Sequence, residues 1–132
     1  MSAAILVVDD EQDIEPLFRQ QFRRELRQGA FIMEFALSAA EALKRIEAVG
    51  VSEVVLIFSD INMPGMNGLD LLERLKTDRP ELAVVMVTAY GDDDTRRAAA
   101  DRGADGLLTK PVDFALLRAE IVARMAEQGG GA

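Results

Sequence analysis

Three carboxylates, a hydroxyl and an ammonium group follow short apolar runs of the sequence: Asp9, Asp10, Asp60, Thr88 and Lys110. If the three carboxylates gather, each pair repels by about 3 kcal/mol at 5 Å and an effective dielectric near 20. The single positive charge of Lys110 cannot neutralise all three negative charges. With only oxygen ligands on offer, a hard divalent cation such as Mg2+ is the natural companion. Together with the lysine and the threonine, it would supply the charge and positioning that phosphoryl transfer needs.

The chain contains no histidine and no cysteine. Ser-His-Asp hydrolysis, Cys-His chemistry and ordinary zinc catalysis are therefore excluded. A hydroxyl nucleophile would need a base, whereas a carboxylate is already ionised at neutral pH and can form an acyl phosphate directly. Asp60 is the best candidate, because it ends the central apolar run and begins a turn-rich loop that reaches Gly68. In that loop Gly65 and Gly68 are expected to allow close backbone approach.

Composition indicates one compact domain. The 132 residues are 49% hydrophobic, and 15 Lys and Arg stand against 23 Asp and Glu, a net charge of −8. This acidic balance argues against direct binding of nucleic acid. No targeting segment and no apolar stretch of about 20 residues is visible, so we expect no membrane span and a cytoplasmic protein. We expect a folded domain over residues 1–128 and a flexible glycine tail over 129–132.

Apolar runs alternate with amphipathic segments five times along the chain. The runs are Ala4–Val8, Phe31–Leu37, Val54–Phe58, Leu82–Val87 and Leu107–Leu108. Between and after them, helical patterns begin at Ile14, after Ser38 with its capping-box partner Glu41, near Leu69, at Asp92 and after Asp113. The alternation predicts an α/β fold, a doubly wound five-stranded parallel sheet flanked by five helices. Glu34 interrupts the second run, which indicates an edge strand.

The polar residues fall where such a sheet places its ligands. Open parallel sheets bind ligands outside the carboxyl ends of their strands, and four of the five runs end in the polar residues named above. Taken singly, Asp9 or Asp10 could cap a helix, Asp60 could belong to an ordinary turn, and Lys110 could simply be solvated. Because all of them follow strands whose carboxyl ends meet at one edge of the predicted sheet, a shared functional site is favoured.

Four stretches resemble the receiver domain of two-component response regulators. They are Ile5–Glu11, Ser59–Gly68, Val87–Tyr90 and Gly103–Pro111, and they span almost the whole chain. The resemblance implies the strand order 2-1-3-4-5, an order the chemotaxis receiver exemplifies. It also implies that Asp60 accepts a phosphoryl group from the phosphohistidine of a sensor histidine kinase or a phosphotransfer protein, and that this switches a surface for a downstream effector protein.

The same resemblance assigns the site residues. Asp10 and Asp60 would bind Mg2+ directly, Asp9 would act largely through water, and Asn62 would offer its backbone carbonyl. Thr88 and Lys110 would hold the phosphoryl oxygens. The protein would be no enzyme in the usual sense, since it catalyses only its own phosphorylation and dephosphorylation. A phosphorylation-dependent homodimer is left open.

The chain departs from the family at one position. Leu107, three residues before Lys110, stands where the family carries a switch aromatic. The helix predicted over Asp92–Arg102 buries mainly alanines and is expected to be the least anchored, so it could supply the switching element instead. Tyr90 either lies beside the phosphoryl group and tunes hydrolysis or is a half-exposed loop aromatic.

Other classes fit the sequence less well. A haloacid-dehalogenase-like phosphatase would share the aspartate nucleophile, but it would want a carboxylic acid where Asn62 stands and a longer chain for a cap. A flavodoxin-like binder would meet repulsion at the acidic first strand end, and the glycine motifs of P-loop and dinucleotide folds are absent. An unphosphorylated pseudo-receiver would normally have lost part of the site.

Overall fold

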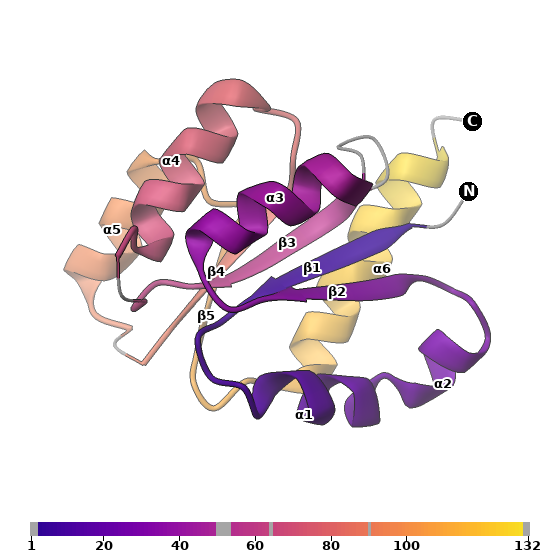
Figure 1. Ribbon diagram of the computed structural model, residues 1–132. Coiled ribbons are helices and arrows are strands. Elements are labelled where there is room, and N and C mark those ends of the chain that lie inside the picture. The colour runs from indigo at the N-terminus through magenta and orange to yellow at the C-terminus, as the bar shows by residue number, and fades with distance from the viewer. Residues whose placement is uncertain (1–2, 50–53, 64, 90, 131–132) are drawn as a thin grey trace.

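The computed structural model describes residues 3–49, 54–63, 65–89 and 91–130. Its centre is a five-stranded parallel sheet in the order β2-β1-β3-β4-β5 (Figure 1). The strands are β1 (Ala4–Val8), β2 (Ile32–Ala36), β3 (Val54–Asp60), β4 (Val84–Thr88) and β5 (Gly106–Thr109). The predicted doubly wound sheet and its strand order are confirmed.

Six helices surround the sheet in the described residues, one more than predicted. They are α1 (Ile14–Gln21), α2 (Arg23–Arg27), α3 (Ala39–Val49), α4 (Gly68–Asp78), α5 (Asp93–Asp101) and α6 (Phe114–Gly130). The extra helix arises because the first predicted helix is interrupted at Phe22, whose φ and ψ are −109° and 22°. Helical hydrogen bonds from Phe22 to Phe18 and from Leu26 to Phe22 continue across this point, and the ring of Phe22 is fully buried against Phe31 and Phe114.

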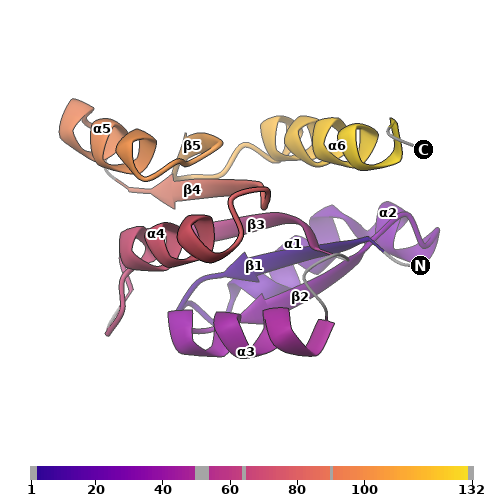
Figure 2. The ribbon, with the colours of Figure 1, turned by 90° about the horizontal axis from the view of Figure 1, so that it is seen from above.

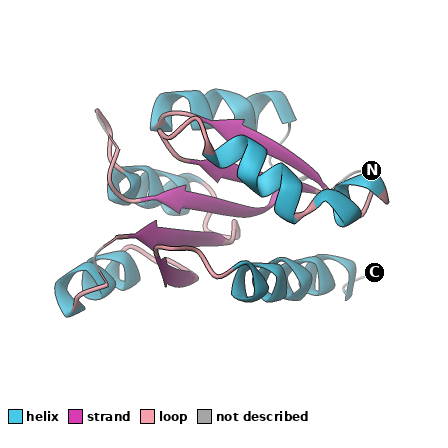
Figure 3. Ribbon diagram, turned by 90° about the horizontal axis from the view of Figure 1, so that it is seen from below, coloured by secondary structure: helices cyan, strands magenta, loops and turns pink. Residues whose placement is uncertain are grey.

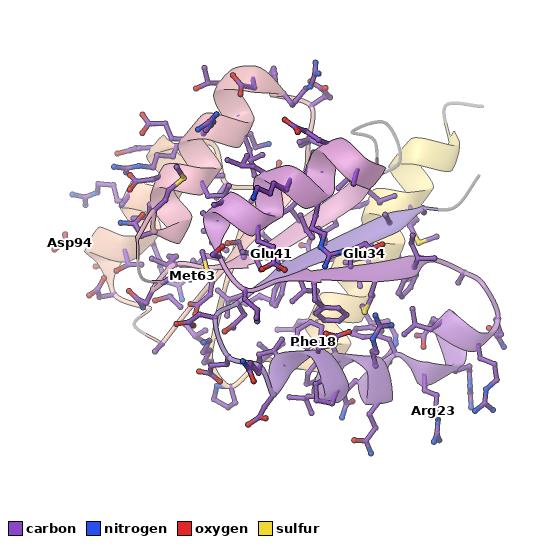
Figure 4. The ribbon with its side chains drawn as sticks, viewed as in Figure 1. Phe18, Arg23, Glu34, Glu41, Met63 and Asp94 are labelled. Atoms are coloured by element: carbon purple, nitrogen blue, oxygen red, sulfur yellow. The ribbon has the colours of Figure 1, made fainter. Side chains whose placement is uncertain are left out.

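The helices form two layers, with α1, α2 and α6 on one face of the sheet and α3, α4 and α5 on the other (Figures 2 and 3). The first face is aromatic, because Phe18, Phe22 and Phe58 pack there with buried residues of α6. Figure 4 shows Phe18 directed from α1 toward the strands. The second face is filled by aliphatic side chains and methionines. None of the described helices is long and apolar enough to cross a membrane.

The strand β2 lies at the edge of the sheet, as Glu34 predicts. Glu34, which Figure 4 labels on β2, forms an ion pair with Arg45 of α3 at 3.8 Å. Arg19 of α1 donates from Nη2 to the carbonyl of Met33 at 3.4 Å and lies over the ring of Phe35. Charged side chains therefore cover part of the free edge, which disfavours pairing with another strand.

Local capping signals place the helix ends. The caps predicted at Ser38 and Asp113 are confirmed: Ser38 accepts from the N–H of Glu41 at 3.1 Å, and Asp113 from that of Ala115 at 2.9 Å. Asp92, predicted only as the start of its helix, also caps it by accepting from the N–H of Thr95 at 2.8 Å. Gly103 ends the α5 turn with a φ of +90°, a conformation that favours glycine. Helical hydrogen bonding in α6 runs on through Gly129 and Gly130 of the predicted glycine tail, whereas residues 131–132 lie outside the described part.

The helix α5 is expected to open more readily than α6. Among the residues of α5 only Ala99 is buried, whereas α6 buries Leu117 and Ile121 in the aromatic core. Because opening costs less where little apolar surface is buried, amide hydrogen exchange should be faster in α5 than in α6. Hydrogen exchange followed by NMR checks this, and slower exchange in α5 would contradict it.

Candidate functional site

The carboxyl ends of β1 and β3 bring three aspartates together. These strands are parallel neighbours in which Val8 pairs with Ser59, so the residues that follow meet at one edge. One carboxylate oxygen each of Asp9, Asp10 and Asp60 lies within 4.8 Å of the others. Asp9 and Asp60 are 8% and 4% exposed, whereas Asp10 is open to solvent. The three acidic residues singled out in the sequence therefore form one cluster.

The ammonium group of Lys110 reaches this cluster from the end of β5. Its Nζ lies 3.2 Å from Oδ2 of Asp60 and 3.5 Å from Oδ2 of Asp9. A third carboxylate, that of Glu11, lies 3.8 Å away and is mostly exposed. The sequence pattern predicts no role of its own for Glu11 in the site. Its position directly after Asp9 and Asp10 is the signal that could have suggested a contact with Lys110.

Backbone N–H groups orient the two buried carboxylates. The N–H of Glu11 donates to Oδ1 of Asp9 at 2.9 Å, and the N–H of Asn62 donates to Oδ1 of Asp60 at 3.3 Å. Each oxygen of Asp60 therefore has a positive or partly positive partner, Asn62 on Oδ1 and Lys110 on Oδ2. Asn62 thus contacts Asp60 through its main-chain N–H group.

The charges in the cluster shift its ionisation. Burial raises the pKa of Asp9 above the ordinary value of 3.8, the N–H of Glu11 opposes this, and the charge of Asp60 adds to the rise. Burial by itself would lower the pKa of Lys110, but the negative charges of Asp60 and Asp9 outweigh it and the pKa is raised. Lys110 is consequently positively charged at neutral pH.

Thr88 ends β4 beside the aspartates and is buried. Its neighbour Val87 pairs with Asp60 in the sheet, and its own carbonyl accepts from the N–H of Lys110 at 2.9 Å. All five residues that the sequence places at strand ends therefore belong to one rim. Leu107 is half-buried and packs against the aliphatic core on the α5 side. Tyr90 lies outside the described residues.

The loop after Asp60 closes against the site through Gly68. The N–H of Gly68 donates to the carbonyl of Ile61 at 2.8 Å, and a Cβ on Gly68 would overlap the carbonyl oxygen of Asp60 and lie 2.7 Å from Cα of Ile61. The predicted close approach is confirmed there. At Gly65 the predicted close approach is wrong, because a Cβ there would have open space around it. Glycine is favoured at this position by its φ of +76°.

The aromatic face of the fold also opens beside the site. A cavity of about 200 Å³ extends from Asp60 and Lys110 between α1 and α6, and Phe18, Phe58 and Pro111 are among its lining residues. A second cavity, of about 320 Å³, lies between α1 and α3 near the end of β2, and Asp9 is among its lining residues. Asp9 therefore borders both cavities.

Together these features define an acidic, lysine-containing site on a doubly wound parallel sheet. The model of the response regulator receiver domain family matches residues 5–122. The chain belongs to this family.

Curated relatives include one of the chain's own size. Sporulation initiation phosphotransferase F of Bacillus subtilis is 30% identical over 118 residues, which cover 89% of this chain and 90% of that protein. Response regulator MprA of Mycobacterium ulcerans is 36% identical over 125 residues, 95% of this chain but 49% of that protein. The chain thus spans about half the length of the MprA proteins it matches.

Solved structures share the whole fold. A CheY-like response regulator receiver domain protein from Methanospirillum hungatei is 30% identical, covers 100% of both chains and superposes with a TM-score of 0.84. The CheY chain of a CheX-CheY-BeF3-Mg2+ complex from Borrelia burgdorferi is 25% identical, with a TM-score of 0.75 over 95% of this chain and 87% of that one.

We predict that Asp9→Asn stabilises the metal-free protein at neutral pH. The substitution removes a buried charge and its repulsion from Asp60, and the raised pKa of Asp9 shows that these costs outweigh the attraction to Lys110 that is also lost. Asparagine can still accept from the N–H of Glu11. The Tm should rise by roughly 3–6 °C. Because the folded protein takes up a proton at the raised pKa of Asp9, the gain should shrink as the pH falls from neutral toward 3.8. Calorimetry beside Asp78→Asn, an exposed control, checks this, and a lowered Tm would contradict it.

We predict that Gly68→Ala costs more stability than Gly65→Ala. The first forces a methyl group into the Asp60 and Ile61 backbone, which costs more than about 2 kcal/mol. The second only strains a positive φ, at about 1 kcal/mol. Urea unfolding measures both, and Gly65→Asn should recover part of the second loss. Equal costs at the two glycines would contradict the close packing.

Proposed function

We propose that this chain is the phosphoacceptor receiver of a two-component response regulator, with Asp60 as the residue that is phosphorylated. The observation that carries the proposal is the geometry of Asp60, whose carboxylate lies 3.2 Å from Lys110 inside a cluster with Asp9 and Asp10. A nucleophile held beside a fixed positive charge and a candidate cation site is what phosphoryl transfer to a carboxylate requires.

The donor set suits Mg2+. The three carboxylates offer only oxygen ligands, carry more negative charge than Lys110 balances, and lie close enough to share one ion. Asp10 and Asp60 would hold it directly, Asp9 largely through water, and Asn62 through its backbone carbonyl. The related CheX-CheY complex from Borrelia burgdorferi contains BeF3 and Mg2+, which supports this assignment. When bound, the ion supplies positive charge to the phosphoryl oxygens.

In the proposed reaction, a carboxylate oxygen of Asp60 attacks the phosphorus of a phosphohistidine. The P–O bond forms as the P–N bond breaks, and the bonding electron pair leaves with the imidazole of the donor. Asp60 becomes an acyl phosphate. Lys110 neutralises charge on the transferred group, and the hydroxyl of Thr88 offers a hydrogen bond to it. The N–H of Asn62 keeps the attacking carboxylate in position.

The partners follow from this chemistry. The donor would be a sensor histidine kinase or a phosphotransfer protein, and phosphorylation would alter a surface that a downstream effector reads, with the protein working in the cytoplasm. Because Leu107 replaces the aromatic of related receivers, we assign the moving part to Thr88 and the lightly packed helix α5. If phosphorylation left the NMR shifts and amide exchange of α5 unchanged, that assignment would fail.

A haloacid-dehalogenase-like phosphatase is disfavoured by position 62. That chemistry wants a carboxylic acid two residues after the nucleophile, and Asn62 presents an exposed amide there while its N–H contacts Asp60. Steady hydrolysis of a small phosphoester by this chain would support the phosphatase hypothesis. A pseudo-receiver is disfavoured because every member of the site is present.

Incubation with acetyl phosphate and Mg2+, followed by intact mass, tests the proposal. We expect one added phosphoryl group, absent in Asp60→Asn and greatly reduced when EDTA removes the metal. The acyl linkage should be cleaved by hydroxylamine. The exposed Asp78→Asn serves as the matched control and should be phosphorylated normally. Phosphorylation that persists in Asp60→Asn would overturn the assignment.

A further inference from the structure

The outer face of α6 carries an apolar stripe without a charged residue. Its members recur at helical spacing over about three turns and are all exposed: Ala115, Leu116, Ala119, Val122, Ala123 and Ala126. The opposite side of the same helix packs into the aromatic core through Leu117 and Ile121. A helix that is apolar on both sides is typical of one covered on both sides.

The stripe is open to solvent in the single chain. Leu116 and Val122 are 54% and 60% exposed, the largest values among the exposed large hydrophobic residues of the described chain. Figures 2 and 3 show α6 at the border of the fold, with no other drawn element on its outer side. In a protein with 29% charged residues, an uncharged helix face of this length indicates a contact surface.

Charges beside the stripe are already paired within the chain. Arg118 binds Glu25 of α2 at 2.6 Å and lies over the ring of Phe22. On the other flank Arg124 lies 3.4 Å from Glu120, one turn away on α6. Among the side chains described up to residue 126, neither flank therefore presents an uncompensated charge to attract a charged partner, and this surface suits an equally neutral, apolar one.

We propose that the occupant is the same face of a second copy, packed antiparallel about a two-fold axis at Ala119. Leu116 and Val122 each stand three residues from Ala119, so this axis brings Leu116 of one copy opposite Val122 of the other. It likewise pairs Ala115 with Ala123. An alanine at the crossing point lets the two helices approach closely, near the lower limit of about 8 Å between axes. The stripe is thus self-complementary in shape as well as in charge, as an isologous contact requires.

The size of the stripe sets the strength of the dimer. From Ala115 to Ala126 the helix rises about 17 Å. A contact one helix wide and this long buries less than the roughly 1,200 Å² of a standard interface, so we expect a weak dimer with a Kd of about 10 µM to 1 mM. The stripe contains none of the residues of the acidic site. The dimer accordingly forms without phosphorylation, and it does not depend on the proposed function.

Sedimentation equilibrium of the wild-type chain across this concentration range tests the proposal. We expect the average mass to rise toward twice that of the monomer, equally in the wild type and in Asp60→Asn. Ala119→Glu should remain monomeric, while Ala100→Glu, which alters an exposed helical alanine on α5, should associate as the wild type does. Circular dichroism confirms that both variants fold. A wild-type chain that stays monomeric at 1 mM, or an unaltered dimer in Ala119→Glu, would overturn the proposal and point to another occupant.

The absence of cysteine from the natural sequence allows a direct test of the axis. A disulfide needs Cα atoms within about 7 Å, so Ala119→Cys should form a cross-linked dimer under mild oxidation far faster than Ala100→Cys. Dilution below the Kd should remove this advantage and bring the first rate toward the second, because both variants then react only through random encounters. Equal rates for the two variants would show that the copies meet elsewhere.

Discussion

Repulsion among three carboxylates that the fold forces together is the constraint on which the site depends. Hydrophobic burial of β1 and β3 fixes the positions of Asp9 and Asp60, because the strands cannot separate without exposing the core. The protein offsets part of the repulsion with Lys110 and with two backbone N–H groups. What remains favours a bound cation, so the strain that the fold imposes is also what prepares the site for its chemistry.

The two faces of the sheet are built differently. Six phenylalanines pack on or beside the face covered by α1, α2 and α6, where ring contacts link α1, β2, β3 and α6. The other face uses smaller aliphatic residues, and α5 contributes only Ala99 to it. The aromatic face therefore holds the site in place. On the other face, α5 buries so little apolar surface that its movement would cost little packing energy.

The helix α6 belongs to both regions. Its inner side anchors the aromatic core, Arg118 ties it to α2, and its first turn follows the loop that carries Lys110. Its outer side is as apolar as a buried helix yet faces solvent in the single chain. The helix α6 therefore connects this exposed apolar side with the loop that carries Lys110 of the acidic site.

The sequence by itself determined the five strands and most of the helices, the edge position of β2, the caps at Ser38 and Asp113, and the set of strand-end residues. These depend on local periodicity and on hydrogen bonds between residues two or three apart, such as that of Glu41 to Ser38. Tertiary structure alone decided the rest. Glu11 pairs with Lys110, and Glu25 with Arg118, across 93 residues or more of chain. The ring of Phe22 packs against Phe114 of the last helix, and Gly68 lies against the backbone of Asp60. No local pattern reports such contacts, because they exist only once separate elements pack against one another.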